Sequence, residues 1–473
     1  MKQPYDLAII GAGSGGLTAA AFAARLGARV ALIEKNRIGG DCTWTGCIPS
    51  KALIHAAKVA QEARTAARFG IVTAPVSVDM AKVREHIRSA VEKVYRAEDP
   101  ETLAKRGIDV IFGGARFVDA HTIAVGDRLI RAARFLITTG ARPTAPNIEG
   151  LSQVPWLSYQ TIFDNGHLPA HLIIVGGGPI GAEIAQAYRR LGSAVTVIAP
   201  TLLPKEEPEA RSLIGDVFAE EGIQWIRGRA RSARMHEAEI VVQTDDTNLP
   251  GSEVRGNLLL VASGRRPDVA GLCLDQAGVR WSPDGIPVDD QLRTSVRHIY
   301  AAGDVTGGPQ FTHLAGWQAF QAVRNALLPG STSGHPKALP RVTFTDPEVA
   351  HVGLTEEQAR AQYGSGIRAA RWDMAHTDRA ICEGDERGFV KIVTKANGTV
   401  LGATVVSARA GETITEFVHA LERGWNVKDL ASAIHAYPTW SVPVQQLASE
   451  MAVGNLLSGA SGRFLLRISK MMR

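Results

Sequence analysis

The chain has 473 residues, of which 45% are hydrophobic and 21% are charged, and its formal net charge is +5. This length and composition predict a globular protein with substantial cores in about three domains. The small excess of basic residues is spread along the sequence without a clustered basic patch, which argues against a nucleic-acid partner.

The two ends of the sequence lack the patterns of targeting and membrane-spanning segments. The first residues lead directly into an apolar strand and a glycine cluster, so we expect no signal or transit peptide. No run approaches the roughly 18 to 20 apolar residues that span a bilayer. We therefore expect a cytoplasmic protein without a membrane span, although residues 464–468 could contact a membrane surface. The basic residues Arg463, Arg467 and Lys470 are expected to form a solvated face.

Residues 7–34 carry the pattern of a nucleotide-binding fold. An apolar strand at 7–10 is followed by a glycine cluster, an alanine-rich helix and a second apolar strand at 30–33 that leads to Glu34. We name residues 11–16 the first glycine turn. Strand, glycine triplet, helix, strand and acid in this register form the complete dinucleotide-binding fingerprint.

Each residue of that fingerprint has its own physical role. Gly11 permits the tight turn, Gly13 lets the backbone approach a pyrophosphate, and Gly16 lets the helix lie close to the strand. The helix N-terminus then faces the phosphates. Glu34 can accept hydrogen bonds from ribose hydroxyls, which disfavours a 2′-phosphate and suits FAD or NAD. We assign the adjacent Lys35 to the same cofactor site.

Two of the four cysteines, Cys42 and Cys47, lie five positions apart, whereas Cys273 and Cys382 stand alone. Four cysteines are too few for a secreted disulfide scaffold, and the pair has no histidine cluster or second pair at zinc spacing. We therefore expect a redox-active pair and no resident metal site. The two isolated cysteines are expected to be inert small hydrophobic residues.

The segment between the paired cysteines is expected to be irregular. In a regular helix, residues five apart rise about 7.5 Å, which exceeds the Cα separation of a disulfide. Gly46 and Pro49 instead indicate a turn from which a helix starts near Cys47. The positive end of that helix would lower the pKa of the Cys47 thiol and leave Cys42 more exposed. Trp44 could shield the dithiol or select a substrate, or it could simply pack.

Residues 172–198 repeat the first design. An apolar strand at 172–175 precedes Gly176, Gly178 and Gly181, which fill the three glycine roles, and a second strand follows at 195–198. We name residues 176–181 the second glycine turn. The chain therefore holds two nucleotide-binding folds.

The second fold differs from the first at the end of its second strand. Ala199 stands where Glu34 stands in the first fold, which removes the repulsion that a 2′-phosphate would meet. Lys205 lies a few residues further on and could pair with that phosphate. We therefore prefer NADPH as the second nucleotide, with NADH as the alternative.

Three further segments are candidates for the flavin site and for domain crossings. The turns at 138–143 and 262–267 each end an apolar strand in Arg-Pro, and we assign Gly140 in the first of them to cofactor binding. The strand near 299–305 ends in Gly303 and Asp304, where a carboxylate could hold a ribityl or phosphate group. Downstream, His313 could approach a flavin, or Thr312 could simply cap a helix.

From about residue 340 the pattern changes to alternating strands. Strand-like runs at 389–394 and 399–406 flank an Asn-Gly turn, which predicts a hairpin. Helical patterns at 413–424 and 427–434 are expected to cover one face of the sheet.

These elements predict an α/β fold with two Rossmann-type domains, for FAD and NAD(P), and a C-terminal α+β domain. The expected boundaries are 1–150 for the first part of the FAD-binding domain, 151–270 for the NAD(P)-binding domain, 271–339 for a central FAD-binding segment and 340–473 for the C-terminal domain.

Residues 39–51 carry a Cys-x4-Cys-x-Pro-Ser-Lys core, and this motif stands together with both glycine turns and the Gly303-Asp304 strand. In these features the chain resembles the pyridine nucleotide-disulfide oxidoreductases, the family of dihydrolipoamide dehydrogenase, glutathione reductase and mercuric reductase. The resemblance covers essentially the whole chain. It implies a homodimer whose C-terminal domain forms the interface and completes the partner's active site.

The resemblance also implies roles for individual residues. Cys47 resembles the thiol beside the flavin, and Cys42 the thiol that exchanges with substrate. Lys51 and Glu183 match the pair beside the flavin ring. Electrons would pass from NAD(P)H through FAD to the disulfide and on to a small-molecule acceptor, or in the reverse direction.

The C-terminal domain departs from the relatives that act on disulfides, which carry His-Pro-Thr with a glutamate three residues after the threonine. Here Tyr437 occupies the acid-base position and Val442 that of its carboxylate partner. Tyr437 could be a ligand, an acid or a packing residue. His435, two residues earlier, could shift into place, but we expect a structural histidine. Efficient reduction of lipoamide or glutathione disulfide is therefore not expected.

Tyrosine at that position, together with residues 195–199 and 205–208, resembles mercuric reductases, whereas residues 454–473 lack their terminal cysteine pair. The leading hypothesis is a mercuric-reductase-like NAD(P)H reductase. The alternatives are dihydrolipoamide dehydrogenase or another disulfide reductase, and a flavin-bearing protein that senses redox state without turnover.

Overall fold

The computed structural model describes residues 4–246, 250–458 and 471–472. The described chain forms two compact units, and two of the boundaries between them fall inside regular elements, α6 (Pro179–Leu191) and β11 (Ile223–Ile226). None of the described helices combines the length and the apolar character needed to cross a membrane. Residues 463–468 and Lys470, for which a surface role was considered, lie outside the described residues. The segments of each unit are as follows: the first holds Met1–Gly176, Ala187–Pro200 and Ile226–Pro336, and the second holds Gly177–Gln186, Thr201–Trp225 and Lys337–Arg473.

A parallel sheet of five strands forms the centre of the first unit, in the order β17-β7-β1-β2-β3. Four of its strands are buried along their whole length, as expected for apolar runs in a parallel sheet, whereas the edge strand β3 exposes Asp109 and Phe112. Successive residues of β1 alternate between two cores, because Leu7 and Ile9 belong to one hydrophobic cluster and Ala8 and Ile10 to another. The bounds are β1 Leu7–Ile10, β2 Val30–Glu34, β3 Ile108–Phe112, β7 Phe135–Ile137 and β17 Ile299–Ala301.

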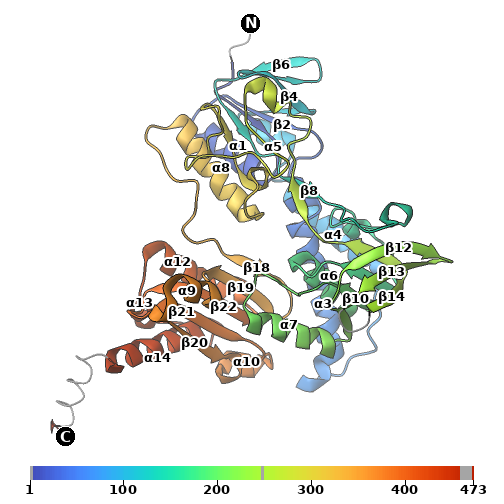
Figure 1. Cartoon of the computed structure of the whole chain (residues 1–473), viewed down its shortest axis with the longest axis vertical. Helices are drawn as coiled ribbons and strands as arrows, with labels where there is room; N and C mark the ends of the chain where they lie inside the picture. The colour runs from blue at the N-terminus through green and yellow to red at the C-terminus, as the bar shows by residue number, and fades with distance from the viewer. Residues whose placement is uncertain (1–3, 247–249, 459–470, 473) are drawn as a thin grey trace. The chain divides into compact units, whose positions relative to one another are not determined.

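Helices α1 (Ser14–Arg25) and α8 (Thr312–Leu327) lie side by side on one face of this sheet (Figure 1). Small residues in both helices belong to the core beneath them, and Phe22 stacks on Phe320 with ring centroids 4.2 Å apart. The other core contains residues of a three-stranded antiparallel sheet, β4-β5-β6. Its bounds are β4 Ala115–Asp119, β5 Thr122–Val125 and β6 Arg128–Arg131. The first glycine turn therefore leads from a buried strand into a helix with a packed face.

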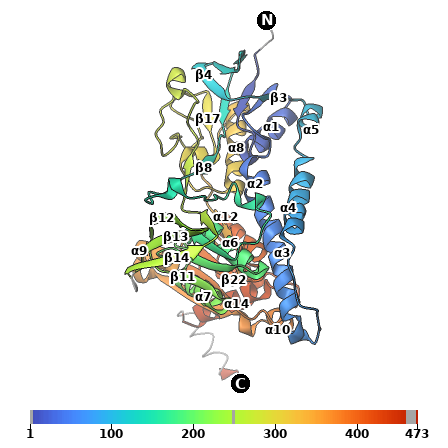
Figure 2. The same ribbon diagram turned by 90° about the vertical axis from the view of Figure 1, so that its right-hand side faces the viewer.

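Four more helices follow the first glycine-rich fold, and the two longest of them, α3 and α4, run side by side (Figure 2). Helix α4 begins after Asp79, whose side chain accepts hydrogen bonds from two backbone amides of the first turn. The bounds are α2 Gly40–Trp44, α3 Cys47–Thr65, α4 Met80–Tyr95 and α5 Pro100–Lys105.

The second glycine-rich fold supplies parallel strands to the first unit in the order β10-β9-β15. An antiparallel meander, β12-β13-β14, shares a hydrophobic core with them. Strands β8 and β16 pair with one another, so the two Arg-Pro crossing segments form a small antiparallel sheet. The bounds are β8 Ala141–Pro143, β9 His171–Val175, β10 Ala194–Ile198, β12 Ala230–His236, β13 Glu239–Asp245, β14 Pro250–Gly256, β15 Leu258–Val261 and β16 Arg265–Pro267.

The second unit centres on an antiparallel sheet in the order β18-β19-β22-β21-β20. The predicted hairpin is confirmed as β21 and β22, and the helices after it contribute to the core on that sheet. The α/β fold with parallel sheets and an antiparallel C-terminal domain is thus confirmed. The bounds are β18 Arg341–Thr343, β19 Glu348–Gly353, β20 Ile367–Asp373, β21 Phe389–Lys395, β22 Val400–Ser407, α7 Pro208–Glu220, α9 Glu356–Tyr363, α10 Asp378–Glu383, α11 Ala410–Thr413, α12 Thr415–Arg423, α13 Val427–Ser432 and α14 Val442–Ser458.

Candidate functional site

The turn between the paired cysteines, residues 42–47, breaks the helical path as predicted. Helix α2 ends at Trp44, and α3 begins at Cys47 with Gly46 as its N-cap. A Cβ at Gly46 would lie 2.8 Å from the Asp41 carbonyl oxygen, so the close turn favours glycine. The Trp44 indole donates a hydrogen bond to the Ile38 carbonyl oxygen (2.7 Å), which fixes its ring at the base of the turn. Cys47 therefore stands at the positive end of α3.

The two cysteine side chains are half-buried and are not joined by a disulfide in this structure. The pKa of the Cys42 thiol is raised above its usual value, first by its hydrogen bond with Cys47 and then by burial. The side chains of Ser14 and Thr312 oppose that rise. Because these residues begin α1 and α8, the dithiol lies near the N-terminal ends of both helices.

Thr312 is a site residue that the sequence analysis misread. It was considered as a helix cap, but it is the first residue of α8 after the N-cap Phe311. Its hydroxyl oxygen lies 3.3 Å from Cys47 Sγ. The neighbouring His313 side chain stacks on Phe311, with ring centroids 5.3 Å apart. No signal in the sequence indicated this contact, because Thr312 and Cys47 lie 265 positions apart.

The first glycine turn has a different constraint at each of its three glycines. Gly11 has φ +103°, and a Cβ there would lie 2.5 Å from the Thr138 carbonyl oxygen. A Cβ at Gly16 would lie 1.9 Å from the Gly11 carbonyl oxygen. At Gly13 the nearest atom would be the Gly40 Cα at 3.8 Å. The outer glycines thus serve the fold itself, whereas the middle one leaves its backbone open to a ligand.

The carboxylate of Glu34 closes this turn from the end of β2. It is 8% exposed, and its two oxygens accept hydrogen bonds from the backbone amides of Ala12 (2.8 Å) and Asn36 (2.7 Å). Lys35 forms an ion pair with Asp268 (2.5 Å). A buried carboxylate beside an open glycine backbone fits the adenosine end of a dinucleotide, so the residues present suit FAD.

Asp304 follows the end of β17 and is 9% exposed. Gly303 has φ +78°, and its amide donates to Gln318 Oε1 (2.9 Å), which holds the turn against α8. Burial raises the pKa of the Asp304 carboxyl, while Arg265 at 3.0 Å lowers it. Gly140 has φ +73°, and no described atom would lie within 4 Å of a Cβ placed there.

Arg265 joins the predicted flavin carboxylate to the cysteine turn, and the sequence analysis did not identify it. Besides Asp304, it pairs with Asp41, the residue before Cys42, at 3.2 Å. Burial lowers the pKa of Arg265, but the charges of Asp304, Tyr159 and Asp41 raise it overall. Its Nε atom is buried without a hydrogen-bond partner among the described residues.

Asp41 collects further hydrogen bonds, from the hydroxyl of Tyr159 (2.7 Å) and from Nε2 of Gln160 (3.1 Å). The residue before Cys42 is therefore anchored from three directions. The acid within the cysteine motif and the Arg-Pro segment at 265–267 were visible in the sequence, but their pairing was not.

The second glycine turn repeats the strain of the first at its opening residue. Gly176 has φ +130°, and a Cβ there would lie 2.5 Å from the Ala262 carbonyl oxygen. A Cβ at Gly178 would meet no described atom within 4 Å, which leaves room for a phosphate. Gly181 is buried in the first turn of α6. Lys205 is exposed, and its carbonyl oxygen accepts a hydrogen bond from Arg341 (2.5 Å).

The two residues matched to the pair beside the flavin ring lie on different helices. Lys51 is half-buried on α3, and Glu183 lies on α6 with 6% exposure. Glu183 Oε1 accepts a hydrogen bond from the backbone amide of Phe344 (2.9 Å).

The C-terminal acid-base segment contains a histidine-carboxylate pair that the sequence analysis did not foresee. His435 Nε2 lies 2.8 Å from Glu416 Oε2, and the histidine side chain is 7% exposed. Tyr437 is 70% exposed, its hydroxyl donates to Asp378, and that hydrogen bond raises its pKa. Val442 begins α14. Glu416 gave no local signal, because it lies on α12 and reaches the histidine through tertiary packing.

Within the described residues, no group of three or more histidine, cysteine, aspartate or glutamate side chains is arranged to hold a metal ion.

Comparisons with known proteins identify the family of the chain. Residues 5–319 match the family described as pyridine nucleotide-disulphide oxidoreductase, and residues 339–448 match its dimerisation domain. The chain is 37% identical to a mercuric reductase of Streptomyces lividans, covering 92% of this chain and 94% of that protein. It is 34% identical to a dihydrolipoyl dehydrogenase of Geobacillus stearothermophilus, covering 94% and 96%.

Solved structures show the same fold. The HOCl-induced flavoprotein disulfide reductase RclA from Escherichia coli aligns with a TM-score of 0.84 at 30% identity, covering 94% of this chain and 99% of that chain. A Cu(II) complex of RclA is also among the similar structures.

Proposed function

The chain belongs to the pyridine nucleotide-disulphide oxidoreductase family, and from that premise we propose that it is an NADPH-dependent flavoprotein that reduces a soft metal ion such as Hg(II). The family implies FAD and a nicotinamide nucleotide, and the matched dimerisation domain indicates a homodimer. We propose three further points: the acceptor, the preference for NADPH and the roles of individual residues.

The observation that carries the proposal is the hydrogen-bonded pair Cys42 and Cys47 at the start of α3. The hydrogen bond between the two sulfurs and their burial raise the pKa of Cys42. We assign the negative charge of the ionised pair to Cys47, because that residue begins α3. The helix N-terminus and the Thr312 hydroxyl stabilise a thiolate there. Cys47 then faces the flavin, and Cys42 is the thiol that exchanges with the acceptor.

The electron balance of this proposal is simple. When bound, FAD carries two electrons from the nicotinamide to the cysteine pair. Opening the Cys42–Cys47 disulfide takes up two electrons and two protons and gives two thiols. Two thiolates bind a soft ion such as Hg(II) well, and return of both electrons forms Hg(0) and re-forms the disulfide. The net reaction is NADPH + Hg²⁺ → NADP⁺ + H⁺ + Hg⁰.

Each cofactor has residues of this chain to hold it. Gly11, Gly13, Gly16 and Glu34 would bind the pyrophosphate and adenosine of FAD, and Asp304 its ribityl chain. In this proposal Lys51 and Glu183 lie beside the flavin ring. The nucleotide would occupy the second glycine turn, where Ala199 leaves space for a 2′-phosphate and the exposed Lys205 supplies a cation.

Disulfide reduction is the second candidate, and the pair His435 and Glu416 favours it. A histidine held 2.8 Å from a carboxylate can move a proton to and from a departing thiol. Ile434 is 97% exposed beside it, which suits a segment that meets the partner subunit. In the family arrangement, this segment would complete the active site of the partner.

Anaerobic titration of the purified holoenzyme with NADPH and with NADH tests the proposal. We expect two-electron reduction to produce the long-wavelength absorbance of a thiolate beside oxidised flavin, and Cys47→Ser to abolish it. Steady NADPH oxidation should follow with Hg(II), and more slowly with lipoamide, glutathione disulfide or quinones. If a disulfide is turned over faster than Hg(II), and if this turnover falls in His435→Gln, disulfide reduction replaces metal reduction as the proposed function. Absence of turnover with every acceptor would indicate a redox-sensing protein.

A further inference from the structure

The segment after β10, residues 201–207, is held by the dimerisation domain; we name it the nucleotide loop. We propose that Lys391 and Arg341, on two strands of that domain, are positioning residues for NADPH binding: they fix the nucleotide loop, and through it the second glycine turn. This inference rests on the proposed nucleotide site, and every contact that carries it lies within the second unit.

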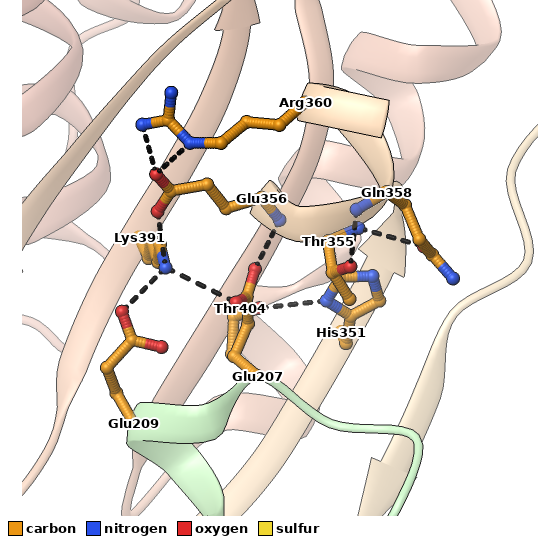
Figure 3. Close-up of polar contacts among 9 residues, drawn as sticks. All are labelled: Glu207, Glu209, His351, Thr355, Glu356, Gln358, Arg360, Lys391 and Thr404. Atoms are coloured by element: carbon orange, nitrogen blue, oxygen red, sulfur yellow. Dashed lines mark hydrogen bonds and ion pairs between the residues drawn. The ribbon is translucent and has the colours of Figure 1, made fainter. Parts of the chain in front are cut away.

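Lys391 forms the centre of a cluster of carboxylates in which Lys391 and Glu207 are buried (Figure 3). Its side chain on β21 is 4% exposed, and its Nζ lies 3.3 Å from Glu207 Oε2, 2.6 Å from Glu209 Oε1 and 2.8 Å from Glu356 Oε2. Glu207 is 1% exposed, and its other oxygen accepts a hydrogen bond from the backbone amide of Glu356 (2.7 Å). We name Lys391, Glu207, Glu209 and Glu356 the lysine cluster. Two of its carboxylates come from the end of the nucleotide loop and the start of α7.

Arg341 on β18 makes a second connection to the same loop. Its Nε lies 2.7 Å from Glu206 Oε1, and its Nη2 donates to the carbonyl oxygen of Lys205 (2.5 Å). The Glu206 side chain is only 5% exposed. The consecutive residues 205, 206 and 207 are therefore all bonded to the dimerisation domain, through one carbonyl oxygen and two buried carboxylates.

The nucleotide loop is bonded in turn to the second glycine turn. The backbone amide of Leu203 donates to the Gly177 carbonyl oxygen (2.7 Å), and the amide of Glu206 donates to the Leu203 carbonyl oxygen (2.9 Å). Leu203 has φ +45° and is 1% exposed, a conformation that a leucine keeps only where its surroundings hold it. A displacement of the loop would therefore move the turn on which the pyrophosphate is proposed to lie.

The helix that follows the turn is connected to the same domain by a second set of bonds. The side chain of Gln186 on α6 accepts from the backbone amide of Asp346 (2.7 Å) and donates to its carbonyl oxygen (2.9 Å). Glu183 accepts from the Phe344 amide (2.9 Å). Both sides of the second glycine turn are thus oriented by residues of the dimerisation domain.

Preorganisation gives these distant contacts an effect on nucleotide affinity. A binding turn that is already in its bound geometry loses less entropy on binding, so loosening it weakens binding without touching the ligand. Coupling between separate sites in proteins is commonly about 5- to 150-fold in affinity. We therefore expect loss of either cation to raise the dissociation constant of the nucleotide about tenfold.

The test uses full-length, FAD-loaded Lys391→Met and Arg341→Met. Calorimetric titration of the oxidised proteins with NADP⁺ gives the dissociation constant, and steady-state assays give KM for NADPH and kcat. We expect both the dissociation constant and KM to rise about tenfold while kcat at saturating NADPH stays within about twofold of wild type. Arg341→Lys, which keeps a cation opposite Glu206, should stay within about threefold of wild type in both constants.

Arg387→Met is the matched control. Arg387 also connects α7 to the dimerisation domain, by an ion pair with Glu220, but that pair is exposed and lies at the other end of the helix. Its loss should leave nucleotide affinity unchanged. If Lys391→Met does not fold, Arg341→Met and its lysine counterpart decide the question.

Unchanged nucleotide affinity in Arg341→Met and in any folded Lys391→Met, with only lower stability, would overturn the inference and leave these residues a purely structural role. An equal loss of affinity in Arg387→Met would overturn it too. The proposed function fails separately, if wild-type protein binds NADP⁺ without its flavin being reduced by NADPH.

Discussion

The two glycine turns share one motif but are held in different ways. In the first, the carboxylate of Glu34 reaches back from the end of β2 and accepts a hydrogen bond from the Ala12 amide of the turn. In the second, Ala199 occupies that place, and the turn is bonded instead through Leu203 to the nucleotide loop. That loop depends on Arg341 and Lys391, more than 100 residues further along the chain.

Two copies of the same nucleotide-binding motif in one chain can therefore be held in place by different contacts. The carboxylate at the end of the second strand has two effects, because it contacts the turn and also repels a 2′-phosphate. A nucleotide-binding fold without that carboxylate needs other contacts to order the turn. Here the adjacent domain provides it. Substitutions can distinguish the first glycine turn, which is held by its own fold, from the second, which is held by the adjacent domain.

Valine substitutions at two differently constrained glycines, the third of the first turn and the middle one of the second, should have unequal effects. In Gly16→Val, a Cβ 1.9 Å from the Gly11 carbonyl oxygen forces α1 away from β1, so we expect loss of bound flavin and of all turnover. In Gly178→Val, the space around the Cβ is open, so we expect normal flavin content. KM for NADPH should rise about tenfold or more, because the side chain fills the phosphate position. Flavin absorbance per chain and KM measure both effects, and full flavin in Gly16→Val would contradict the contrast.

Removal of the central cation of the lysine cluster should destabilise the protein strongly. Lys391→Met leaves the buried Glu207 without its ion-pair partner, so we expect a loss of about 3–5 kcal/mol in the free energy of unfolding. The exposed control Arg387→Met should cost less than about 1 kcal/mol. Denaturant unfolding followed by fluorescence measures both. Equal losses in the two variants would show that burial of the ion pair does not increase its contribution to the free energy of unfolding.

The same cluster predicts a pH dependence. The pKa of Glu356 is lowered by its hydrogen bond with Lys391, and that of Glu209 is lowered because the same cation outweighs its burial. Their contribution to stability is therefore present above the ordinary value of 4.5 and is lost as the pH falls through the lowered values. Burial lowers the pKa of Lys391, but its carboxylate neighbours raise it overall, so its contribution is lost only as the pH rises beyond 10.5. The stability difference between wild type and Lys391→Met should be largest between these limits and should shrink below about pH 4.

Placing a carboxylate at the end of β10 should make the second fold resemble the first. In Ala199→Glu, the new charge repels a 2′-phosphate and can accept from ribose hydroxyls. We expect the ratio of kcat/KM for NADPH to that for NADH to fall about tenfold or more, as for a single opposing charge near a phosphate. Ala199→Gln has nearly the same size without the charge and serves as the control. An equal change in both variants would indicate a steric cause.

The smallest expected effect concerns the dithiol and should not reach the nucleotide. Thr312→Val removes the hydroxyl 3.3 Å from Cys47 Sγ, which costs a thiolate about 1 kcal/mol of hydrogen bonding. The pH midpoint of the long-wavelength absorbance in the two-electron-reduced protein should therefore rise by about 0.5–1 unit. Thr312→Ser should keep the wild-type midpoint. A change in NADP⁺ affinity in Thr312→Val would show that the two regions are less independent than proposed.

Local patterns were sufficient to predict much of the fold and part of the site. The strands of both glycine-rich folds, the hairpin β21 and β22, and the helix start at Cys47 all have signatures within about 20 residues. Glycine spacing and an acid in register carry the nucleotide fingerprint in the sequence itself. The break between the cysteines was predicted from helix geometry together with Gly46 and Pro49.

Side-chain partners that are distant in sequence could not be predicted in this way. Arg265 reaches Asp41 across 224 positions, and Lys391 reaches Glu207 across 184. Glu416 pairs with His435 from a neighbouring helix. None of these pairs has a local signature. An arginine or a glutamate on a single helix or strand is expected at the surface, and only the packing of a second element shows that it is buried.

The amino-acid sequence by itself thus determined which segments become strands, turns and helices, and it predicts which backbone positions can approach a phosphate. Only the tertiary structure decided which charges lie together, and therefore which cation pairs with the carboxylate before Cys42 and which cations hold the nucleotide loop. The physical reason is that backbone conformation follows from short-range sterics and periodicity, whereas the partner of a buried charge depends on how separate elements pack.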